Sequence, residues 1–299
     1  MLNIGIVGLK NATPYIDALK HSSSFNFVGI YDPSLLIENN FAPDINVFQS
    51  FGDLCGDCNA VIFSIDDSLY YPLVCEAIRH SLDVFVAGVQ SYQTKELNSL
   101  LRLRDEAHCV VHVGHKFIGD DFFTTLRRQC DHPLDIHCQI VRDSNNNLVS
   151  LARTELSMLL MLAPANIHRV AVNVFSSFSS VPDSLRVRLD FDNGAVGNIC
   201  IDHYGLNPEH TIRVLNYNTI ANADMLARRL SVIDSNTPDT PIVKKTNTEC
   251  SSPAKTQLAA FLSSITNGSE LFNCLENEIR AQLVCERIHE KMRINFNVF

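Results

Sequence analysis

The residues best suited to chemistry lie near the start of the chain, between Asn3 and Thr13. Apolar residues 4–7 predict a strand, Gly8 ends it and a helix follows, which is the layout of a dinucleotide-binding turn. In the glycine fingerprint of such turns, the first glycine makes the bend and the second lets backbone approach a pyrophosphate. Here Lys10 stands in the second place and Thr13 in the third, where a glycine would let helix and strand pack closely. The chemistry indicated is cofactor binding, with two of the three glycines replaced.

An acid at the end of the next strand fits the same function. Asp32 follows Gly8 by 24 residues, where a carboxylate would bind the ribose hydroxyls of NAD and repel the extra phosphate of NADP. Lys10 has two interpretations: it pairs with a phosphate, or it is solvated or fills the place of the pyrophosphate, and the second is favoured. An ordinary βα turn with a strand-end aspartate explains the motif, taken alone, equally well.

The elements that must hold these residues alternate between strand and helix up to about residue 118. Largely apolar strands separated by helices are typical of a doubly wound parallel sheet of Rossmann type. The expected strands are 4–7, 27–31, 45–48, 60–65, 84–86 and 110–113, and the expected helices are 14–20, 73–78 and 95–107.

The pattern changes after residue 118. Residues 185–191 alternate between apolar and polar, as in a strand with one buried face, and Asp192-Asn193-Gly194 predicts a hairpin turn. We therefore expect two domains, 1–118 and 119–299, the second an α+β domain with a mostly antiparallel sheet. Further expected strands are 171–178, 195–201 and 211–217, further helices 155–162, 255–265 and 276–293, and residues 231–253 are expected to form a loop.

Several short stretches, taken in their order and spacing, point to one family. They are residues 5–8, 29–32, 59–64, 75–78, 84–86, 113–117 and 191–197. Through these stretches the chain resembles the Gfo/Idh/MocA family of oxidoreductases over nearly its whole length. The resemblance implies a Rossmann domain followed by a sheet-forming domain that often mediates oligomers, with NAD or NADP as cofactor. It implies that Gly8, Lys10, Asp32 and Ser64 bind the cofactor.

The same comparison shows departures from the family pattern. The family's Glu-Lys-Pro after the fifth strand, whose lysine lies by the nicotinamide and substrate, has Gly88 in the lysine place. Its acid and histidine pair for proton transfer falls on Ser150 and Thr154, and its proline and histidine after the fourth strand fall on Asp66 and Tyr70. Glycine, serine and threonine cannot supply the proton transfer that lysine, aspartate and histidine perform.

Two further groups of residues are candidate sites. His115 and Lys116 follow the last strand of the predicted sheet, where ligands bind, so they are the remaining candidates for polar contact with a ligand. A structural histidine and a surface lysine explain them as well. Cys55 and Cys58 have the spacing of a metal or redox pair, but no second ligand pair lies near them in the sequence, so no metal site is expected.

Composition narrows the class of protein. The chain has 299 residues, 46% of them hydrophobic, and a formal net charge of -9. Such an acidic balance argues against a nucleic-acid or anionic-membrane partner. The N-terminus lacks the basic region of a signal peptide, and ten scattered cysteines indicate reduced thiols, so a cytoplasmic location is expected.

Two hypotheses on function follow. The first is a Gfo/Idh/MocA-like protein with degenerate catalytic and cofactor sites, a pseudoenzyme that acts as a binding or oligomer-forming partner and binds no cofactor at all in its extreme form. The second is an active NAD(P)-dependent oxidoreductase, acting on a sugar or related polyol, in which His115 or Lys116 transfers the proton. Under either, a homo-oligomer and a small sugar-like ligand are the expected partners; a sugar-binding module without redox chemistry is a third reading.

Overall fold

The computed structural model describes residues 1–20, 24–33, 45–130, 132–142, 147–177, 182–234, 242–247, 252–269 and 273–296. The chain forms two compact units. The first comprises Met1–Asp120 and Ser251–Ile279, and the second comprises Asp121–Cys250 and Arg280–Phe299. The first unit ends within two residues of the expected boundary at residue 118, and it also includes the late segment Ser251–Ile279, which the expected division assigned to the second domain.

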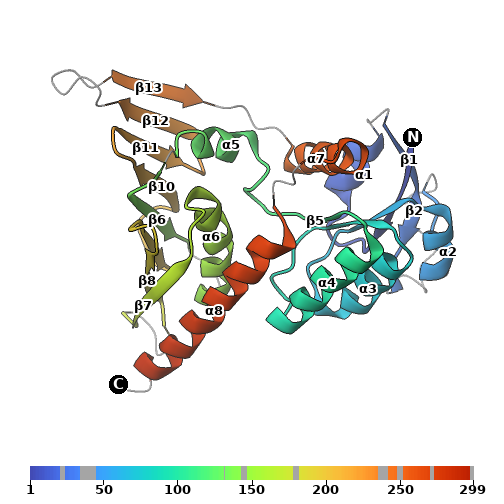
Figure 1. Ribbon diagram of the computed structural model, residues 1–299, viewed down its shortest axis with the longest axis horizontal. Coiled ribbons are helices and arrows are strands. Elements are labelled where there is room, and N and C mark those ends of the chain that lie inside the picture. Colours follow the sequence, from blue (N-terminus) through green and yellow to red (C-terminus); the bar gives the residue numbers. More distant parts are fainter. Residues whose placement is uncertain are drawn as a thin grey trace. The chain divides into compact units, whose positions relative to one another are not determined.

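The first unit holds a five-stranded parallel sheet in the order β2-β1-β3-β4-β5. This confirms the Rossmann-type fold, and Figure 1 shows α3 beside α4 and α1 beside α7. Its elements are β1 (Leu2–Val7), α1 (Thr13–Lys20), β2 (Phe25–Tyr31), α2 (Phe51–Asp57), β3 (Ala60–Phe63), the 3₁₀ turn η2 (Ser68–Tyr70), α3 (Tyr71–Arg79), β4 (Asp83–Val86), α4 (Thr94–Ala107), β5 (Val111–Val113) and α7 (Pro253–Asn267).

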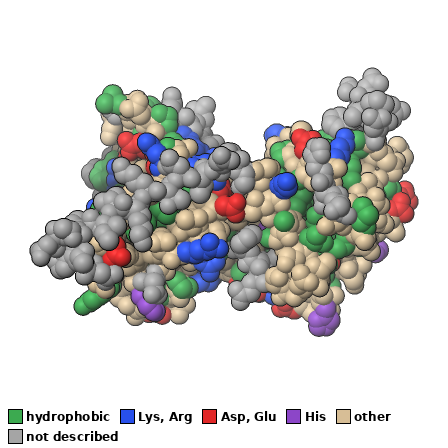
Figure 2. All heavy atoms as spheres, turned by 90° about the horizontal axis from the view of Figure 1, so that it is seen from above, with side chains coloured by type: hydrophobic (Ala, Val, Ile, Leu, Met, Phe, Trp, Pro, Cys, Tyr) green, Lys and Arg blue, Asp and Glu red, His purple; other side chains and the backbone are tan. Residues whose placement is uncertain are grey.

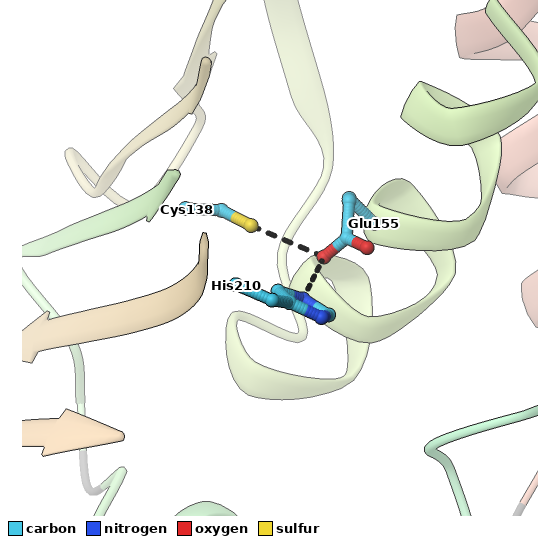
Figure 3. A group of neighbouring side chains, drawn as sticks. All are labelled: Cys138, Glu155 and His210. Atoms are coloured by element: carbon cyan, nitrogen blue, oxygen red, sulfur yellow. Dashed lines mark hydrogen bonds and ion pairs between the residues drawn. The ribbon is translucent and has the colours of Figure 1, made fainter. Parts of the chain in front are cut away.

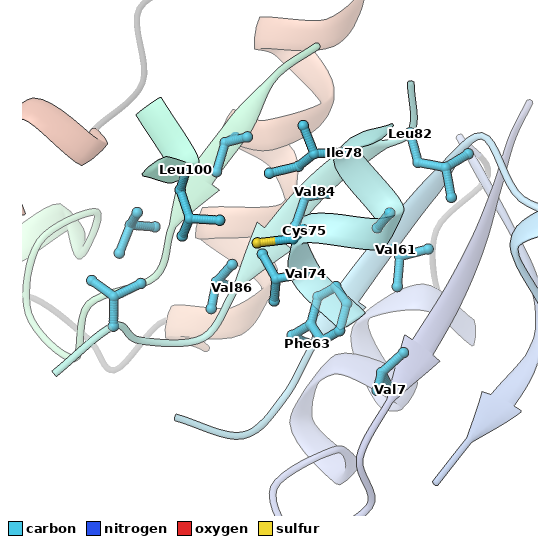
Figure 4. Packing of buried hydrophobic residues seen from close by; sticks show 14 of the residues in the cluster. Val7, Val61, Phe63, Val74, Cys75, Ile78, Leu82, Val84, Val86 and Leu100 are labelled. Atoms are coloured by element: carbon cyan, nitrogen blue, oxygen red, sulfur yellow. The ribbon is translucent and has the colours of Figure 1, made fainter. Parts of the chain in front are cut away.

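Alternate residues of each central strand face opposite sides of this sheet. In β3, Val61 and Phe63 point to a core shared with α2, α3 and α4 (Figure 4). Ile62 points to a second core, where it meets residues of α1 and α7. Every strand is covered on both faces, which explains why they are almost wholly apolar in sequence. The expected strand at residues 45–48 is reduced to a single bridge between Val47 and Ile30.

The second unit holds an eight-stranded sheet in the order β13-β12-β11-β10-β6-β9-β8-β7, antiparallel except where β6 runs parallel to β9. A mostly antiparallel α+β domain is thereby confirmed. Its elements are α5 (Asp121–Arg127), β6 (Asp135–Val141), α6 (Leu148–Leu162), β7 (Ile167–Phe175), β8 (Ser184–Phe191), β9 (Val196–Asp202), β10 (Glu209–Leu215), β11 (Thr219–Asp224), β12 (Arg229–Asp234) and β13 (Ile242–Asn247); α8 (Leu275–Phe296) belongs to the first unit up to residue 279 and to the second beyond it.

The expectation of a loop at 231–253 is wrong in its described part. The end of β12 and the whole of β13 fall within it, paired antiparallel to one another. The sequence of β13 is mostly polar, so its strand depends on main-chain pairing with β12, which the side-chain pattern does not reveal. Residues 235–241 and 248–251 of that expected loop, and residue 178 of an expected strand, lie outside the described residues.

Helix α6 covers one face of the second sheet. It buries most of its length, and the Leu159 side chain approaches Gly197 of β9 so closely that a Cβ there would meet it at 3.0 Å. Charged groups are mixed on the surface: on the face drawn in Figure 2, Lys and Arg side chains occur in small groups among Asp and Glu. None of the described helices combines the length and the apolar character needed to cross a bilayer.

Candidate functional site

The turn between β1 and α1 has the backbone form that the sequence predicts. Gly8 adopts a φ of +86° and donates its amide to the Tyr31 carbonyl at 3.0 Å. Its position requires a glycine for a second reason, because a Cβ would meet Ile65 Cδ1 at 2.6 Å. The first fingerprint position therefore keeps its structural role, and helix α1 begins five residues later at Thr13.

Two of the predicted cofactor residues are brought to this turn. Asp32, which is 5% exposed, accepts the Leu9 amide on Oδ2 at 2.9 Å. Ser64 is fully buried, and its hydroxyl donates to the Gly8 carbonyl at 2.6 Å. Gly8, Asp32 and Ser64 thus form one connected group at the carboxyl ends of β1, β2 and β3. The hydroxyl of Ser64 therefore has a structural role, because its hydrogen bond to the Gly8 carbonyl stabilises the turn.

Lys10, the fourth predicted cofactor residue, is exposed at the tip of the same turn. Its ammonium makes no hydrogen bond or ion pair with the part of the chain that the structure describes. A solvated lysine and a lysine that contacts a phosphate are both compatible with this position.

The loop after β4 closes around Asp66. Gly88, which aligns by sequence with the family's lysine, lies against this residue: a Cβ on the glycine would meet Asp66 Oδ2 at 2.8 Å. The Asp66 carboxylate accepts the Gln90 amide at 2.8 Å, the Ser91 amide at 3.0 Å and the Ser91 hydroxyl at 2.8 Å. These bonds close the loop over the carboxylate. A lysine at position 88 could not be accommodated without displacing Asp66.

Replacing Asp66 by alanine is expected to loosen this loop. Three acceptor bonds are lost, and a capping carboxylate contributes about 1 kcal/mol. Hydrogen exchange at the Gln90 and Ser91 amides should therefore accelerate about fivefold or more. Asp67→Ala is the matched control, since Asp67 caps the neighbouring turn through the Leu69 amide at 2.9 Å and should leave Gln90 protected. Equal protection of Gln90 in both variants would show that Asp66 does not hold the loop.

His115 and Lys116 lie after β5, as expected, but the histidine is tied into the backbone. Its Nδ1 accepts the amides of Phe117 at 3.2 Å and Ile118 at 3.1 Å. The Gln257 side chain accepts the main-chain amide of His115 and donates to the main-chain carbonyl of His115, each at 3.1 Å. Because Nδ1 already accepts two hydrogen bonds, that nitrogen is not open to take a proton from a ligand. Lys116 is exposed, with its ammonium 5.1 Å from the centre of the Phe117 ring.

His112, Cys55 and Cys58 are core residues of the first unit. His112 stacks on Phe85 with ring centres 4.9 Å apart, and burial lowers its pKa from the usual 6.5 to about 3. Cys55 and Cys58 are buried free thiols. Burial raises the pKa of Cys55 to about 11 and that of Cys58 to about 12, so neither is the reactive thiolate that redox chemistry needs.

Ser150 and Thr154, the places of the family's proton-transfer pair, both lie on α6 in the second unit. Ser150 is exposed, and the Thr154 hydroxyl donates to the Ser150 carbonyl at 3.5 Å. Neither side chain ionises in the range that general acid or base chemistry requires.

The structure also brings together a group that sequence reasoning missed. Cys138, Glu155 and His210 meet inside the second unit, with the thiol and the imidazole both bonded to Glu155 (Figure 3). One signal was present in the sequence: Ile136, Cys138 and Ile140 alternate with more polar residues, which predicts a strand with Cys138 on its buried face.

Comparison with known proteins places the fold. Residues 2–115 match the Gfo/Idh/MocA family, described as "Oxidoreductase family, NAD-binding Rossmann fold". Among curated proteins nothing matches.

Solved structures match over the whole chain at low identity. UDP-N-acetylglucosamine 3-dehydrogenase GnnA from Acidithiobacillus ferrooxidans is similar, with a TM-score of 0.86, 15% identity and 99% of each chain covered. GenD2 from gentamicin A biosynthesis, solved in complex with NAD, has a TM-score of 0.76 at 13% identity, over 97% of this chain and 93% of that one. Biliverdin reductase from Synechocystis, solved with biliverdin and NADP+, has a TM-score of 0.76 at 14% identity, over 97% and 98%. These likenesses show the fold.

Proposed function

We propose that this chain, a divergent member of the Gfo/Idh/MocA oxidoreductase family through residues 2–115, binds a dinucleotide but lacks the family's lysine-dependent hydride-transfer site. The observation that carries the proposal is the loop at Gly88. This loop has a glycine where the family has its lysine. The glycine lies against Asp66, and the Asp66 carboxylate closes the loop. The absence of the lysine side chain, together with the position of Asp66, indicates a rebuilt site.

The residues at the β1–α1 turn fit a dinucleotide. Gly8 keeps the bend, and Asp32 stands beside it with a buried carboxylate suited to ribose hydroxyls. Asp32, Gly8 and Lys10 would hold the adenosine half, and a bound NAD would supply a hydride acceptor. The charge of Asp32 opposes the 2′-phosphate of NADP, so NAD is the cofactor that these residues favour.

The biological role under this proposal is that of a binding or oligomer-forming partner, located in the cytoplasm. The support is that Gly88, Ser150 and Thr154 all lack the groups that the family uses for proton transfer, while both domains of the fold persist. A neighbouring side chain can compensate for one such loss. Three losses in one protein favour a site that no longer transfers protons. Assembly as a homo-oligomer and binding of a sugar-like ligand belong to this proposal.

Titration with NADH tests the binding half of the proposal. We expect saturable binding, followed by nicotinamide fluorescence or thermal stability, with NADH bound more tightly than NADPH. Asp32→Asn should weaken NADH binding about 10- to 100-fold, because a charge-assisted hydrogen bond to ribose contributes roughly 1.5 to 3 kcal/mol. The asparagine keeps an oxygen for the Leu9 amide, so the turn should stay folded.

Asp17→Asn on α1 removes one exposed carboxylate of equal charge and should leave NADH affinity unchanged. The absence of any saturable response to NADH, or equal effects of the two variants, would contradict dinucleotide binding through Asp32.

A second function is favoured by the exposed position of Lys116 after β5. In this alternative the chain is an active NAD(P)-dependent oxidoreductase on a sugar or nucleotide sugar, the substrate class in the name of one similar structure. NADH oxidation or NAD reduction with a panel of such compounds decides between the two. Turnover that is lost in Lys116→Ala, with NADH affinity retained, would establish the enzyme and remove the first proposal.

A further inference from the structure

Three side chains of metal-ligating type meet in the interior of the second unit. Cys138 comes from β6, His210 from β10 and Glu155 from α6, and each is less than 5% exposed. Cys138 Sγ lies 3.1 Å from Glu155 Oε2, and His210 Nε2 lies 3.1 Å from the same oxygen. The three ligand atoms are all within 4.8 Å of one another (Figure 3).

The register of the sheet explains how two of them meet. Strands β6 and β10 are antiparallel neighbours, and His210 pairs with Ile140. Cys138 is two residues from Ile140 and on the same buried face, so the thiol and the imidazole are diagonal neighbours. Helix α6 lies over this face of the sheet and adds Glu155 from above. The group therefore joins two strands and a helix at one point.

The group lies among apolar side chains. Along the strands the neighbours on the same face are Ile136, Ile140 and Ile212, and Leu156 and Leu159 are buried on the helix. Burial brings the three ligand atoms together away from water, and a thiol is only a weak hydrogen-bond donor. One sulfur, one nitrogen and one oxygen ligand are together the set that Zn²⁺ accepts.

We propose that Cys138, Glu155 and His210 form a three-ligand Zn²⁺ site that joins α6 to β6 and β10. In tetrahedral coordination at ordinary Zn–S and Zn–N lengths, ligand atoms lie roughly 3.3 to 3.6 Å apart. The present 3.1 Å separations need to widen by only a few tenths of an ångström. On binding, the thiol releases its proton to solvent, the neutral imidazole coordinates through the Nε2 lone pair with its proton on Nδ1, and the carboxylate coordinates as it stands.

Among the described residues no fourth Cys, His, Asp or Glu joins the group, so water takes the remaining coordination position. The metal would hold the helix that carries Ser150 and Thr154, and this role does not depend on dinucleotide binding. It replaces the expectation from the sequence that the chain holds no metal. Since all three ligands are buried, Zn²⁺ enters as the unit folds.

The test is to refold the full chain with Zn²⁺ or Co²⁺ and without metal. We expect one metal ion per chain after dialysis, a higher unfolding midpoint than in the metal-free protein, and a thiolate-to-Co²⁺ charge-transfer band. Cys138→Ala should abolish the band, and Glu155→Gln, which keeps a hydrogen-bond acceptor for both partners, should weaken Zn²⁺ binding more than about tenfold. Cys200→Ala is the control, because Cys200 sits on neighbouring β9 opposite Gln139 of β6, outside the group.

Two results would overturn the proposal. One is the absence of stoichiometric Zn²⁺ in protein refolded with the metal. The other is a Co²⁺ spectrum without thiolate character, or one that Cys200→Ala removes and Cys138→Ala leaves intact. If Cys138→Ala fails to fold, Glu155→Gln gives the same decision, since equal Zn²⁺ affinity in that variant contradicts the site.

Discussion

Lowering the pH from 7 to 4 should reduce the unfolding free energy of the first unit by about 3 kcal/mol through a single buried residue, His112. Its imidazole is 1% exposed, stacks on Phe85 and meets the edge of Phe261. Burial lowers its pKa from 6.5 to about 3. Within the described residues its Nδ1 has no hydrogen-bond partner, so nothing near it favours the charged form.

The sign of this effect follows from proton uptake on unfolding. Above pH 6.5 the imidazole is neutral in both states, and its contribution to stability is complete. Between pH 6.5 and about 3 the unfolded chain binds a proton that the folded unit does not, so stability falls by up to about 1.4 kcal/mol for each pH unit. Below pH 3 both states are protonated and the loss levels off.

His112→Phe isolates this contribution. Phenylalanine preserves a ring between Phe85 and Phe261 but cannot bind a proton. Between pH 7 and pH 4 the unfolding free energy of the variant should therefore rise relative to that of the parent by about 3 kcal/mol. Denaturant unfolding at each pH, followed by hydrogen exchange at amides of β4 and β5, measures the difference. Phe63→Leu is the control: it weakens packing in the core on the other face of the same sheet, by a similar amount at every pH. A constant difference between His112→Phe and the parent would refute the assignment.

Gly8→Ala should destabilise the first unit by about 2 to 5 kcal/mol. An L-residue at φ +86° costs roughly 1 to 2 kcal/mol, and the new methyl group would also meet Ile65 Cδ1 at 2.6 Å, an overpacking cost of about 1 to 3 kcal/mol. The measurement is the denaturant midpoint at constant m-value.

Gly268→Ala separates the two causes. Gly268 belongs to the same unit and has a φ of +65°, but nothing lies within 4 Å of the position of its Cβ. Its replacement should cost only about 1 kcal/mol, since backbone strain is the only effect. If the two variants lose equal stability, the contact with Ile65 plays no part.

Sequence reasoning succeeded where the physical signal is local. The strands around Val61 and Val84 are short apolar runs between helices, and such runs form parallel sheets covered on both faces. Gly8 and Asp32 were placed together because a strand–turn–helix and a strand end leave few alternatives. The family resemblance rested partly on these same elements, and the family match confirms it over residues 2–115.

What could not be predicted depends on long-range contacts. The segment that forms β13 has no clear apolar alternation, and it becomes a strand only through pairing with β12. The contact between Asp66 and Gly88 joins two loops that are 22 positions apart, and the bonds to Gln90 and Ser91 cannot be read from residue types. His115 was considered for ligand contact, whereas the bonds of its Nδ1 to Phe117 and Ile118 show a backbone-stabilising role.

The division of the chain into interleaved units has a consequence for its synthesis. The five strands of the first sheet are complete once residue 113 has been made, but one face of that sheet is covered by α1 together with Leu258 and Phe261 of α7. At ribosomal rates of about 5 to 20 residues per second, the α7 part of this cover is synthesised roughly 7 to 30 seconds after the strands. During this interval the nascent chain presents a partly uncovered apolar sheet face, the kind of surface that chaperones recognise. A fragment ending near residue 118 would remain in that state permanently.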